Sequence, residues 1–435
     1  MRSQLPRPTR LSATDLPFYV FLLTAGLCLF RAADLPSVEV GAGGTSLSVG
    51  PADVALLVTA ALAALQLVRR RTIPSPWLLA ATATFALLVV VSAVPNGADA
   101  VAAAGKVGEF GVLTLGAAVF IDSRSRFATL AAVLVGFCVV ATTWGAVEFV
   151  AEGGKRQGAF MGEHDLAALA SVAVVLGLAH VFAGERRPPV VALIGIGFGA
   201  LGIVVGASLA SVLGLYVGTA AMILLAAARR DVRRRAVLVA LVICAVVTAG
   251  TYGVRSADLG FLQAWFGPPP ETPGQYAASW SQRLIYVYIG GRVFLDHPIL
   301  GTGWEGELPP SDYAEYLPDA RERYPDQPAH YFPPADGTLI PQQTYDQVLF
   351  ELGLVGAGVF ALMLGLAVFR AALAGRVPRP GQRWAEQAYV PLGWLAVMTG
   401  ALAGAALFGG SPLAALFFLG VGVAAAEAAP REAVA

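Results

Sequence analysis

Arginines in two polar segments are the side chains of this sequence best suited to bind a phosphate group. Lys155 and Arg156 begin the segment KRQGAFMGEHDLAALA (155–170), and Arg283 lies in SWSQRLIYVYI (279–289). A guanidinium group keeps its charge and can bind a phosphate through two parallel hydrogen bonds. We therefore expect Arg156 and Arg283 to bind an anionic ligand. Alternatively, Lys155 and Arg156 could anchor the chain to lipid headgroups.

Arg292 is a third candidate for the same anionic ligand. It follows Arg283 by nine residues, so on one straight helix the two side chains would face opposite ways. Gly290 and Gly291 lie between them and are predicted to end or bend the helix. Such a break would allow Arg292 to turn toward the same cavity as Arg283.

Two histidines could contact the ligand or move a proton. His164 lies between Glu163 and Asp165 at the predicted start of a helix, where Asp165 is a plausible N-cap. His330 lies in DQPAHYFPPADG (326–337), which is too irregular for a helix. We predict His164 as a ligand contact and His330 as a candidate general base, although His330 could also be an exposed loop residue.

Ionisable residues also occur inside apolar runs, where each one is costly. Lys106 and Glu109 are three residues apart, so they could pair on one helix, or Lys106 could face an anionic ligand. Glu351 lies one turn inside the apolar part of PQQTYDQVLFELGLVGAGVF (341–360). We expect Glu351 to face the cavity at the mouth of its helix and to orient that mouth by hydrogen bonds, unless it is only an interfacial residue.

The composition indicates the elements that must position these residues. The chain has 435 residues, of which 57% are hydrophobic and only 13% charged, about half the charged share of a soluble domain. Twelve apolar runs are long enough, or nearly so, to cross a bilayer as helices. They lie near 16–33, 51–68, 76–94, 101–121, 127–150, 165–183, 189–206, 209–228, 236–254, 347–369, 389–408 and 412–428. The predicted fold is an all-α integral membrane protein with about twelve transmembrane helices.

The distribution of basic residues predicts the orientation of these helices. One set of alternate loops, together with the two termini, holds 20 of the 29 Lys and Arg residues. Because basic residues favour the cytoplasmic side, we expect both termini to be cytoplasmic. The net charge is zero, so charge gives no reason to expect a nucleic-acid partner. The three cysteines all fall inside apolar runs and predict neither a disulfide framework nor a metal site.

One long segment interrupts the pattern of short loops. Residues 255–346, here called the cap, hold 13 of the 28 prolines and many aromatic residues. A structureless loop of this length is uncommon, and the aromatic content argues against disorder. We predict a partly helical cap over the outer ends of the bundle. The chain then divides into nine helices within 1–254, the cap, and three helices within 347–435.

Four stretches, in this order, resemble the O-antigen ligase and polymerase family of bacterial envelope glycosyltransferases. The stretches are RQGAFMGEHDLAALA, GASLASVLGLYVG, SQRLIYVYIGGRVFLDHPILGTGWEG and QTYDQVLFELGLVGAGVF. The third contains Asp-x-Pro-x-x-Gly-x-Gly and the fourth Leu-x-Glu-x-Gly-Leu-x-Gly, as that family does. The resemblance covers most of the chain beyond residue 100.

This resemblance implies a reaction at the outer face of the bacterial cytoplasmic (inner) membrane. The donor would be a glycan linked to polyprenyl diphosphate, and the acceptor a glycan or glycolipid. Arg156 and Arg283 would bind the diphosphate, with no metal, nucleotide sugar or other cofactor. Fixed guanidinium groups in a poorly hydrated cavity can stabilise the charge that develops on a diphosphate leaving group.

The sequence departs from the family at one position. Ligases of this family carry a histidine nine residues before the glutamate of the last motif, and here that residue is Gln342. Glutamine cannot accept a proton at working pH. We place Gln342 in the catalytic site and expect His330, Asp346 or His164 to take over the proton transfer.

Three other functions are compatible with parts of the sequence. A secondary transporter would also have twelve helices, but the halves of this chain show no repeat. A peptidoglycan polymerase of the shape, elongation, division and sporulation type would also have a late outer loop, with Asp346 as its aspartate. A non-catalytic relative would explain Gln342.

Overall fold

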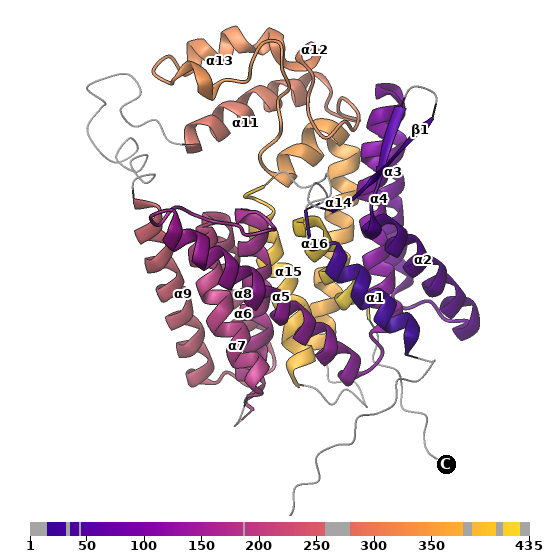
Figure 1. Cartoon of the computed structure of the whole chain (residues 1–435), viewed down its shortest axis with the longest axis vertical. Coiled ribbons are helices and arrows are strands. Elements are labelled where there is room, and N and C mark those ends of the chain that lie inside the picture. Colours follow the sequence, from indigo (N-terminus) through magenta and orange to yellow (C-terminus); the bar gives the residue numbers. More distant parts are fainter. Residues whose placement is uncertain are drawn as a thin grey trace, which may run out of the picture.

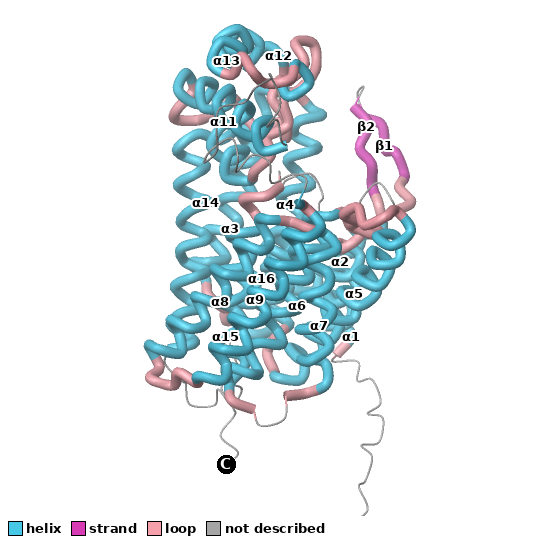
Figure 2. Tube along the Cα trace, turned by 90° about the vertical axis from the view of Figure 1, so that its left-hand side faces the viewer, coloured by secondary structure: helices cyan, strands magenta, loops and turns pink. Residues whose placement is uncertain are grey.

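The protein is a helical bundle with one smaller layer of helices over one of its ends (Figures 1 and 2). The computed structural model describes residues 15–31, 35–42, 45–185, 188–256, 279–376, 385–405 and 412–426. Within these residues the strands are confined to one hairpin, β1 (Val38–Ala42) and β2 (Thr45–Val49), in which Val38 pairs with Val49. The hairpin, which was not predicted, stands beside the helical layer at the same end (Figure 2).

Each predicted apolar run coincides with a helix of the bundle. The helices are α1 (Leu16–Leu27), α2 (Pro51–Arg70), α3 (Pro76–Ala93), α4 (Ala98–Phe120), α5 (Arg124–Ala151), α6 (Glu163–Ala183), α7 (Val190–Gly206), α8 (Leu209–Ala228), α9 (Arg234–Val254), α14 (Thr344–Arg376), α15 (Ala385–Ala401) and α16 (Pro412–Ala425). Among the described residues, eight helices are long and apolar enough to cross a membrane, while α1, α7, α15 and α16 are shorter. The chain is therefore a multi-pass membrane protein, and twelve crossings remain a prediction.

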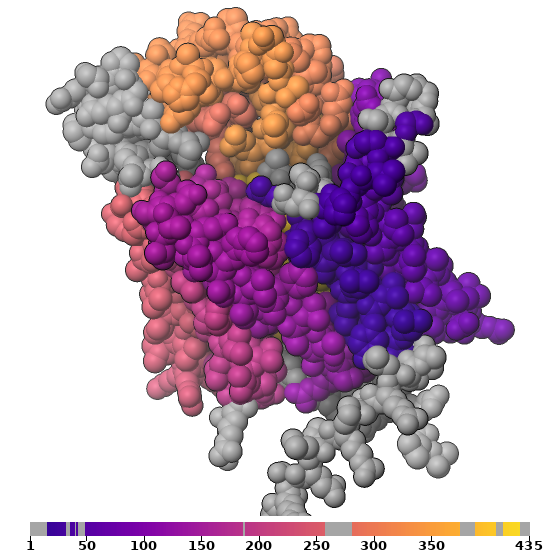
Figure 3. All heavy atoms as spheres, in the orientation of Figure 1, coloured from indigo at the N-terminus to yellow at the C-terminus, as the bar shows by residue number. Residues whose placement is uncertain are grey.

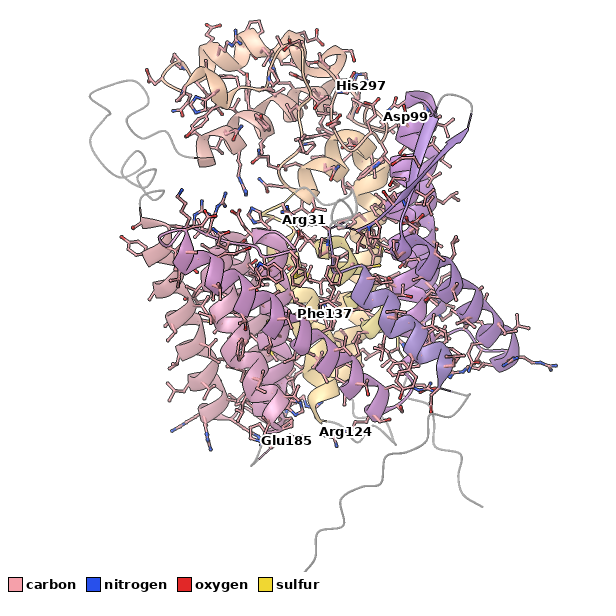
Figure 4. All side chains as sticks on the ribbon, in the orientation of Figure 1. Arg31, Asp99, Arg124, Phe137, Glu185 and His297 are labelled. Carbon is pink, nitrogen blue, oxygen red and sulfur yellow. The ribbon has the colours of Figure 1, made fainter. Side chains whose placement is uncertain are left out.

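The described part of the cap is largely helical. It contains α11 (Ser279–Asp296), α12 (Pro310–Tyr313), α13 (Leu317–Arg323) and the short 3₁₀ helices η4 (Ala314–Tyr316) and η5 (Ala329–Tyr331). Another 3₁₀ turn, η2 (Val94–Asn96), follows α3. The buried face of α11 packs under α12 and α13 in an apolar cluster of its own. Figure 3 shows the cap, in orange, seated on one end of the bundle. Arg124 and Glu185 lie at the opposite end (Figure 4).

Close packing of α6 against α7 forms the centre of one half of the bundle. Of the eight long helices, α6 is the most buried. The glycines of α7 that approach α6 or α5 are Gly195, Gly199, Gly202 and Gly206. A Cβ atom on Gly199 would lie 2.6 Å from the carbonyl oxygen of Ala170 in α6. Small residues at such spacings allow the two backbones to approach each other, which is how membrane helices gain packing energy.

The helix α11 runs unbroken through Gly290 and Gly291, so the predicted break is wrong. Gly290 is needed for packing instead, because a Cβ atom there would lie 2.0 Å from the ring of Phe350 in α14. Because Gly290 has no side chain, α11 can pack closely on α14. Since α11 is continuous, Arg283 and Arg292 project from opposite sides of it.

The helix α14 is interrupted at Gly353, and a loop of the cap fills the gap. Gly353 has φ 60° and ψ −161°, which is not helical. The N–H of Leu354 donates to the Pro298 carbonyl at 2.9 Å, and that of Val355 to Ile299 at 3.1 Å. In return, the N–H of Gly303 donates to the Glu351 carbonyl at 2.9 Å. The backbone groups freed by the kink are thus satisfied by the Asp-x-Pro-x-x-Gly-x-Gly segment.

The Glu351 carboxylate completes this junction. Its side chain is fully buried, and its Oε2 accepts from the backbone N–H groups of Glu305 at 2.9 Å and Gly306 at 2.8 Å. Its Oε1 accepts from Gln347 Nε2 at 3.1 Å. Glu351 therefore fastens the cap to the mouth of α14 by hydrogen bonds, whereas the expectation that it faces the cavity was wrong, because these bonds hold its carboxylate.

We predict that Gly199→Ala destabilises the protein and that Gly197→Ala does not. The new methyl group at 199 would collide with the α6 backbone, whereas a Cβ at 197 meets no atom within 4 Å. Overpacking of this kind costs about 1–3 kcal/mol. The apparent melting temperature of each variant in detergent measures the effect. Equal values for the two variants would contradict the described packing of α7 on α6.

We also predict that Glu351→Ala loosens the cap from α14. The substitution removes the acceptor of two partly buried backbone N–H groups, which costs about 2–5 kcal/mol. The expected results are a lower melting temperature and faster proteolysis within the cap. Glu322→Ala, which alters an exposed carboxylate of α13, is the control. Cleavage of both variants at the wild-type rate would rule out the anchoring role.

Candidate active site

A pocket of ≈ 670 Å³ lies between the cap and the bundle, and six separate parts of the chain contribute to it. Its lining residues are Arg156, His164, Leu209, Ala210, Leu213, Arg255, Gln282, Arg283, Leu284, Val287, Gln342, Gln343 and Ala403. Figure 4 shows several nitrogen-tipped side chains gathered in the region between α11 and the helix ends below it. We call this cavity the arginine pocket.

Three arginines face this pocket, and none of the described residues that line it is acidic. Arg283 donates from Nη2 to the carbonyl oxygen of Gly404 at 3.1 Å. Burial, together with the nearby charges of Arg255 and Arg156, lowers the pKa of Arg283, while Asp346 acts in the opposite direction. The cations thus repel one another in a partly desolvated space. Such an arrangement favours binding of an anion.

The loop between α5 and α6 holds Arg156 in place. Gln157 N donates to the Val205 carbonyl at 3.0 Å, and Arg31 Nε donates to the Met161 carbonyl at 2.8 Å. Figure 4 shows Arg31 between the bundle and the cap. Arg156 Nε itself lies 3.1 Å from Glu163 Oε2. This ion pair orients one edge of the guanidinium group, and Arg156 still lines the pocket.

Arg255 was not singled out in the sequence. It follows α9 directly and donates from Nη1 to the carbonyl oxygen of Ala207 at 3.4 Å. A signal for it existed, because it is an arginine at the same predicted membrane face as Arg156. Only the fold shows that the ends of α6 and α9 adjoin the same pocket.

His164 also lines the pocket, in the first turn of α6. Its Nδ1 lies 3.2 Å from the Ser208 hydroxyl, which in turn accepts from the backbone N–H of Ser211 at 3.3 Å. Ser208 is the N-cap of α8, as expected for a serine before a helix. This contact joins the motif RQGAFMGEHDLAALA, which contains His164, to the motif GASLASVLGLYVG, which contains Ser208. It also fixes the position of the imidazole ring.

One wall of the pocket is apolar. It is formed by Leu209, Ala210 and Leu213 at the start of α8 and by Leu284 and Val287 of α11. The side chain of Leu213 is 55% exposed, so this wall continues onto the outer surface of the bundle. The pocket therefore combines cationic groups with an apolar wall that reaches the surface expected to meet lipid.

The segment before α14 supplies the remaining polar lining. Gln342, at the position where the resemblance leads us to expect histidine, lines the pocket together with Gln343. Asp346 follows in the first turn of α14, close enough to interact with the charge of Arg283. The segment is fixed to the end of α15, because Thr344 N donates to the Leu402 carbonyl at 3.1 Å.

Five of the predicted site residues do not line the arginine pocket, and one of them, Asp346, follows the lining residues Gln342 and Gln343 as described above. Arg292 pairs with Asp319 in the cap, with 2.8 Å between Nη2 and Oδ2. His330 is exposed and packs edge-on against Tyr331. The other two, Lys106 and Glu351, lie in or beside the membrane helices.

Lys106 forms ion pairs on the other half of the bundle. Its Nζ lies 2.6 Å from Asp53 Oδ2 and 3.9 Å from Glu109 Oε2. The predicted pair with Glu109 is therefore present, but Asp53 of α2 is the nearer partner. Lys106 lines a separate cavity near the β-hairpin. The carboxylate of Glu351 is occupied by the hydrogen bonds that hold the cap.

Residues 192–361 match the family model described as O-antigen ligase. No curated protein matches the chain. The matched segment runs from α7 into α14, so it contains Arg255, Arg283 and Gln342, while Arg156 and His164 precede it. Over residues 192–361 the chain is therefore similar to the O-antigen ligase family, which confirms the resemblance predicted from its motifs.

Proposed function

We propose that this protein transfers a glycan from a polyprenyl-diphosphate carrier to an acceptor sugar, as a ligase or a polymerase of lipid-linked glycans. The observation that carries the proposal is the arginine pocket, in which Arg156, Arg255 and Arg283 converge beside an apolar wall. A lipid diphosphate has the same two parts, an anionic head and an apolar chain. The similarity to O-antigen ligases supports a glycosyl transfer.

The proposed site faces the outside of the bacterial cytoplasmic membrane. In this arrangement twelve helices cross the membrane, both termini are cytoplasmic, and the cap lies over the outer ends. The positions of the basic residues support it, because Arg70, Arg124 and Arg126 belong to the end opposite the cap. The polyprenyl chain would then leave the pocket along Leu213 into the outer leaflet.

The arginines act on the leaving group. As the bond between the anomeric carbon and the diphosphate oxygen breaks, negative charge grows on the diphosphate. Arg283 and its neighbours are held in a partly desolvated space without an acidic lining residue, so they stabilise that charge more than water would. Guanidinium groups supply the charge that a metal ion supplies in other diphosphate chemistry.

Asp346 is the proposed general base. It takes the proton of the acceptor hydroxyl as that oxygen bonds to the anomeric carbon and the diphosphate leaves with the bonding electrons. Asp346 lies in the first turn of α14, directly after the pocket-lining residues Gln342 and Gln343. Gln342 would hold the acceptor by hydrogen bonds from its amide. The exposed His330 is less suited to the role.

We predict that Arg156→Ala and Arg283→Ala each lower glycan transfer by at least about 100-fold, because each removes a charged donor from the leaving group. The assay is transfer in proteoliposomes from a polyprenyl-diphosphate-linked oligosaccharide. Arg292→Ala is the control, since Arg292 lies on the same helix as Arg283 but pairs with Asp319 outside the pocket. Wild-type turnover in either pocket variant would refute the proposal. Movement of glycan across the bilayer without bond formation would favour a transporter.

We predict that Asp346→Asn reduces turnover by about 10²- to 10⁴-fold, the usual contribution of a general base. The amide keeps the shape of the side chain but cannot accept the proton. His330→Ala should leave the rate within about twofold of wild type. Single-turnover rates at saturating donor measure both effects. Full activity of Asp346→Asn would assign the proton transfer to another group, with His164 the next to test.

A further inference from the structure

A second hollow adjoins the arginine pocket on the side of the α5–α6 loop. It has a volume of ≈ 490 Å³ and is lined by Glu152, Lys155, Arg156, Gln157, Glu163, Val254 and Arg255. Arg156 and Arg255 line both cavities, so this pair of side chains forms the boundary between them. We call the second hollow the polar groove.

The two cavities differ in chemistry. The arginine pocket has an apolar wall and no acidic side chain among its described lining, whereas six of the seven lining residues of the polar groove are charged or carry an amide. Glu152 and Glu163 offset two of the three cations that line the groove, so a diphosphate should be attracted less strongly there than to the arginine pocket. Carboxylates, an ammonium group and an amide together can accept hydrogen bonds and donate them. This mixture suits the hydroxyl groups of a sugar.

Backbone hydrogen bonds hold the loop that forms the polar groove. The α5 helix ends at Ala151, and Gly154 N returns to the Phe149 carbonyl at 2.8 Å. Gly153 and Gly154 both adopt positive φ, 68° and 87°, which turns the chain sharply toward Lys155. Gln157 N is bonded to the Val205 carbonyl at the other end of the loop. Glu152 and Gln157 are thus held at the two ends of a short, anchored turn.

We propose that the polar groove binds the sugar that is attached directly to the donor diphosphate. This inference rests on the proposed function. A lipid-linked donor has three parts in a fixed order, namely an apolar chain, a diphosphate and a sugar. The protein presents an apolar wall, a group of arginines and a polar groove, and the arginines at the boundary connect the other two.

The charges of the groove also select the class of sugar. Glu163 is 3.1 Å from Arg156 and is therefore partly neutralised, while Glu152 and Lys155 are exposed to an incoming ligand. The two carboxylates offset two of the three cations that line the groove, so a uronic acid would gain little attraction in this position. A neutral or N-acetylated hexose satisfies the same donors and acceptors without adding negative charge.

Binding of two defined lipids to the full-length protein in nanodiscs tests the inference. The lipids are undecaprenyl diphosphate alone and undecaprenyl diphosphate linked to N-acetylglucosamine. Wild type should bind the sugar-bearing lipid more tightly. The double variant Glu152→Ala with Gln157→Ala should lose about tenfold in affinity for the sugar-bearing lipid, which corresponds to one or two lost hydrogen bonds. Its affinity for the bare lipid should stay within about twofold of wild type.

Glu148→Ala provides the matched control. Glu148 lies in the last turn of α5, four residues before Glu152, and does not line the groove. Its carboxylate accepts a hydrogen bond from Trp144. This variant should bind both lipids as wild type does. If the double variant keeps the wild-type preference for the sugar-bearing lipid, or loses affinity equally for both lipids, the groove is not the sugar site. If wild type does not bind undecaprenyl diphosphate, the proposed function itself is wrong.

Discussion

The exchange of backbone hydrogen bonds between the kink of α14 and the Pro298–Gly303 loop is the constraint on which the site depends. Gly353 interrupts the helix, and the loop restores the bonds that the helix loses there. A Cβ atom on Gly353 would lie 2.5 Å from the carbonyl of Ile299, so the two backbones can meet only if no side chain intervenes. Because the loop continues directly from α11, this junction sets the height and direction of that helix. Arg283 is thereby placed above Arg156 and Arg255, although it belongs to a different layer of the protein.

A group of arginines with no acidic side chain among the described residues of the pocket lining carries an electrostatic cost, which hydrogen bonds and one ion pair help to offset. Carbonyl oxygens of Gly404 and Ala207 accept from Arg283 and Arg255, and Glu163 pairs with Arg156. Asp346 lies close to Arg283 but outside the pocket lining. A bound anion can neutralise positive potential at this site, so under the proposed function the arginines would favour a diphosphate and, more strongly, the state in which its charge increases.

The helices of the bundle could be predicted from sequence because a membrane segment needs only length and apolarity, and all twelve runs coincide with helices. The site was predictable only in part. Arg156, Arg283, His164 and Gln342 do line one pocket. Arg255 was overlooked although it lies at the same predicted membrane face as Arg156, because only the fold brings the end of α9 to this pocket. Gly290 was misread as a helix break, since the sequence does not show that Phe350 packs against it. The nearer partner of Lys106 and the β-hairpin likewise depend on contacts between segments that are distant in the chain.

In the proposed function, the position of Gln342 separates ligand binding from proton transfer. It lines the pocket beside Arg283, on a segment that Thr344 and Tyr345 fasten to α15 through bonds of 3.1 Å from Thr344 to the Leu402 carbonyl and 2.8 Å from Tyr345 to the Thr399 carbonyl. The backbone at position 342 is therefore held in place by bonds of neighbouring residues, and these bonds do not involve the side chain at 342. The arginines belong to other elements, so an exchange of histidine for glutamine leaves the anion site intact. In the proposed reaction the exchange alters which group near the mouth of α14 accepts the proton. The carboxylate of Asp346, four residues after Gln342 and in the first turn of α14, belongs to the same end of that helix.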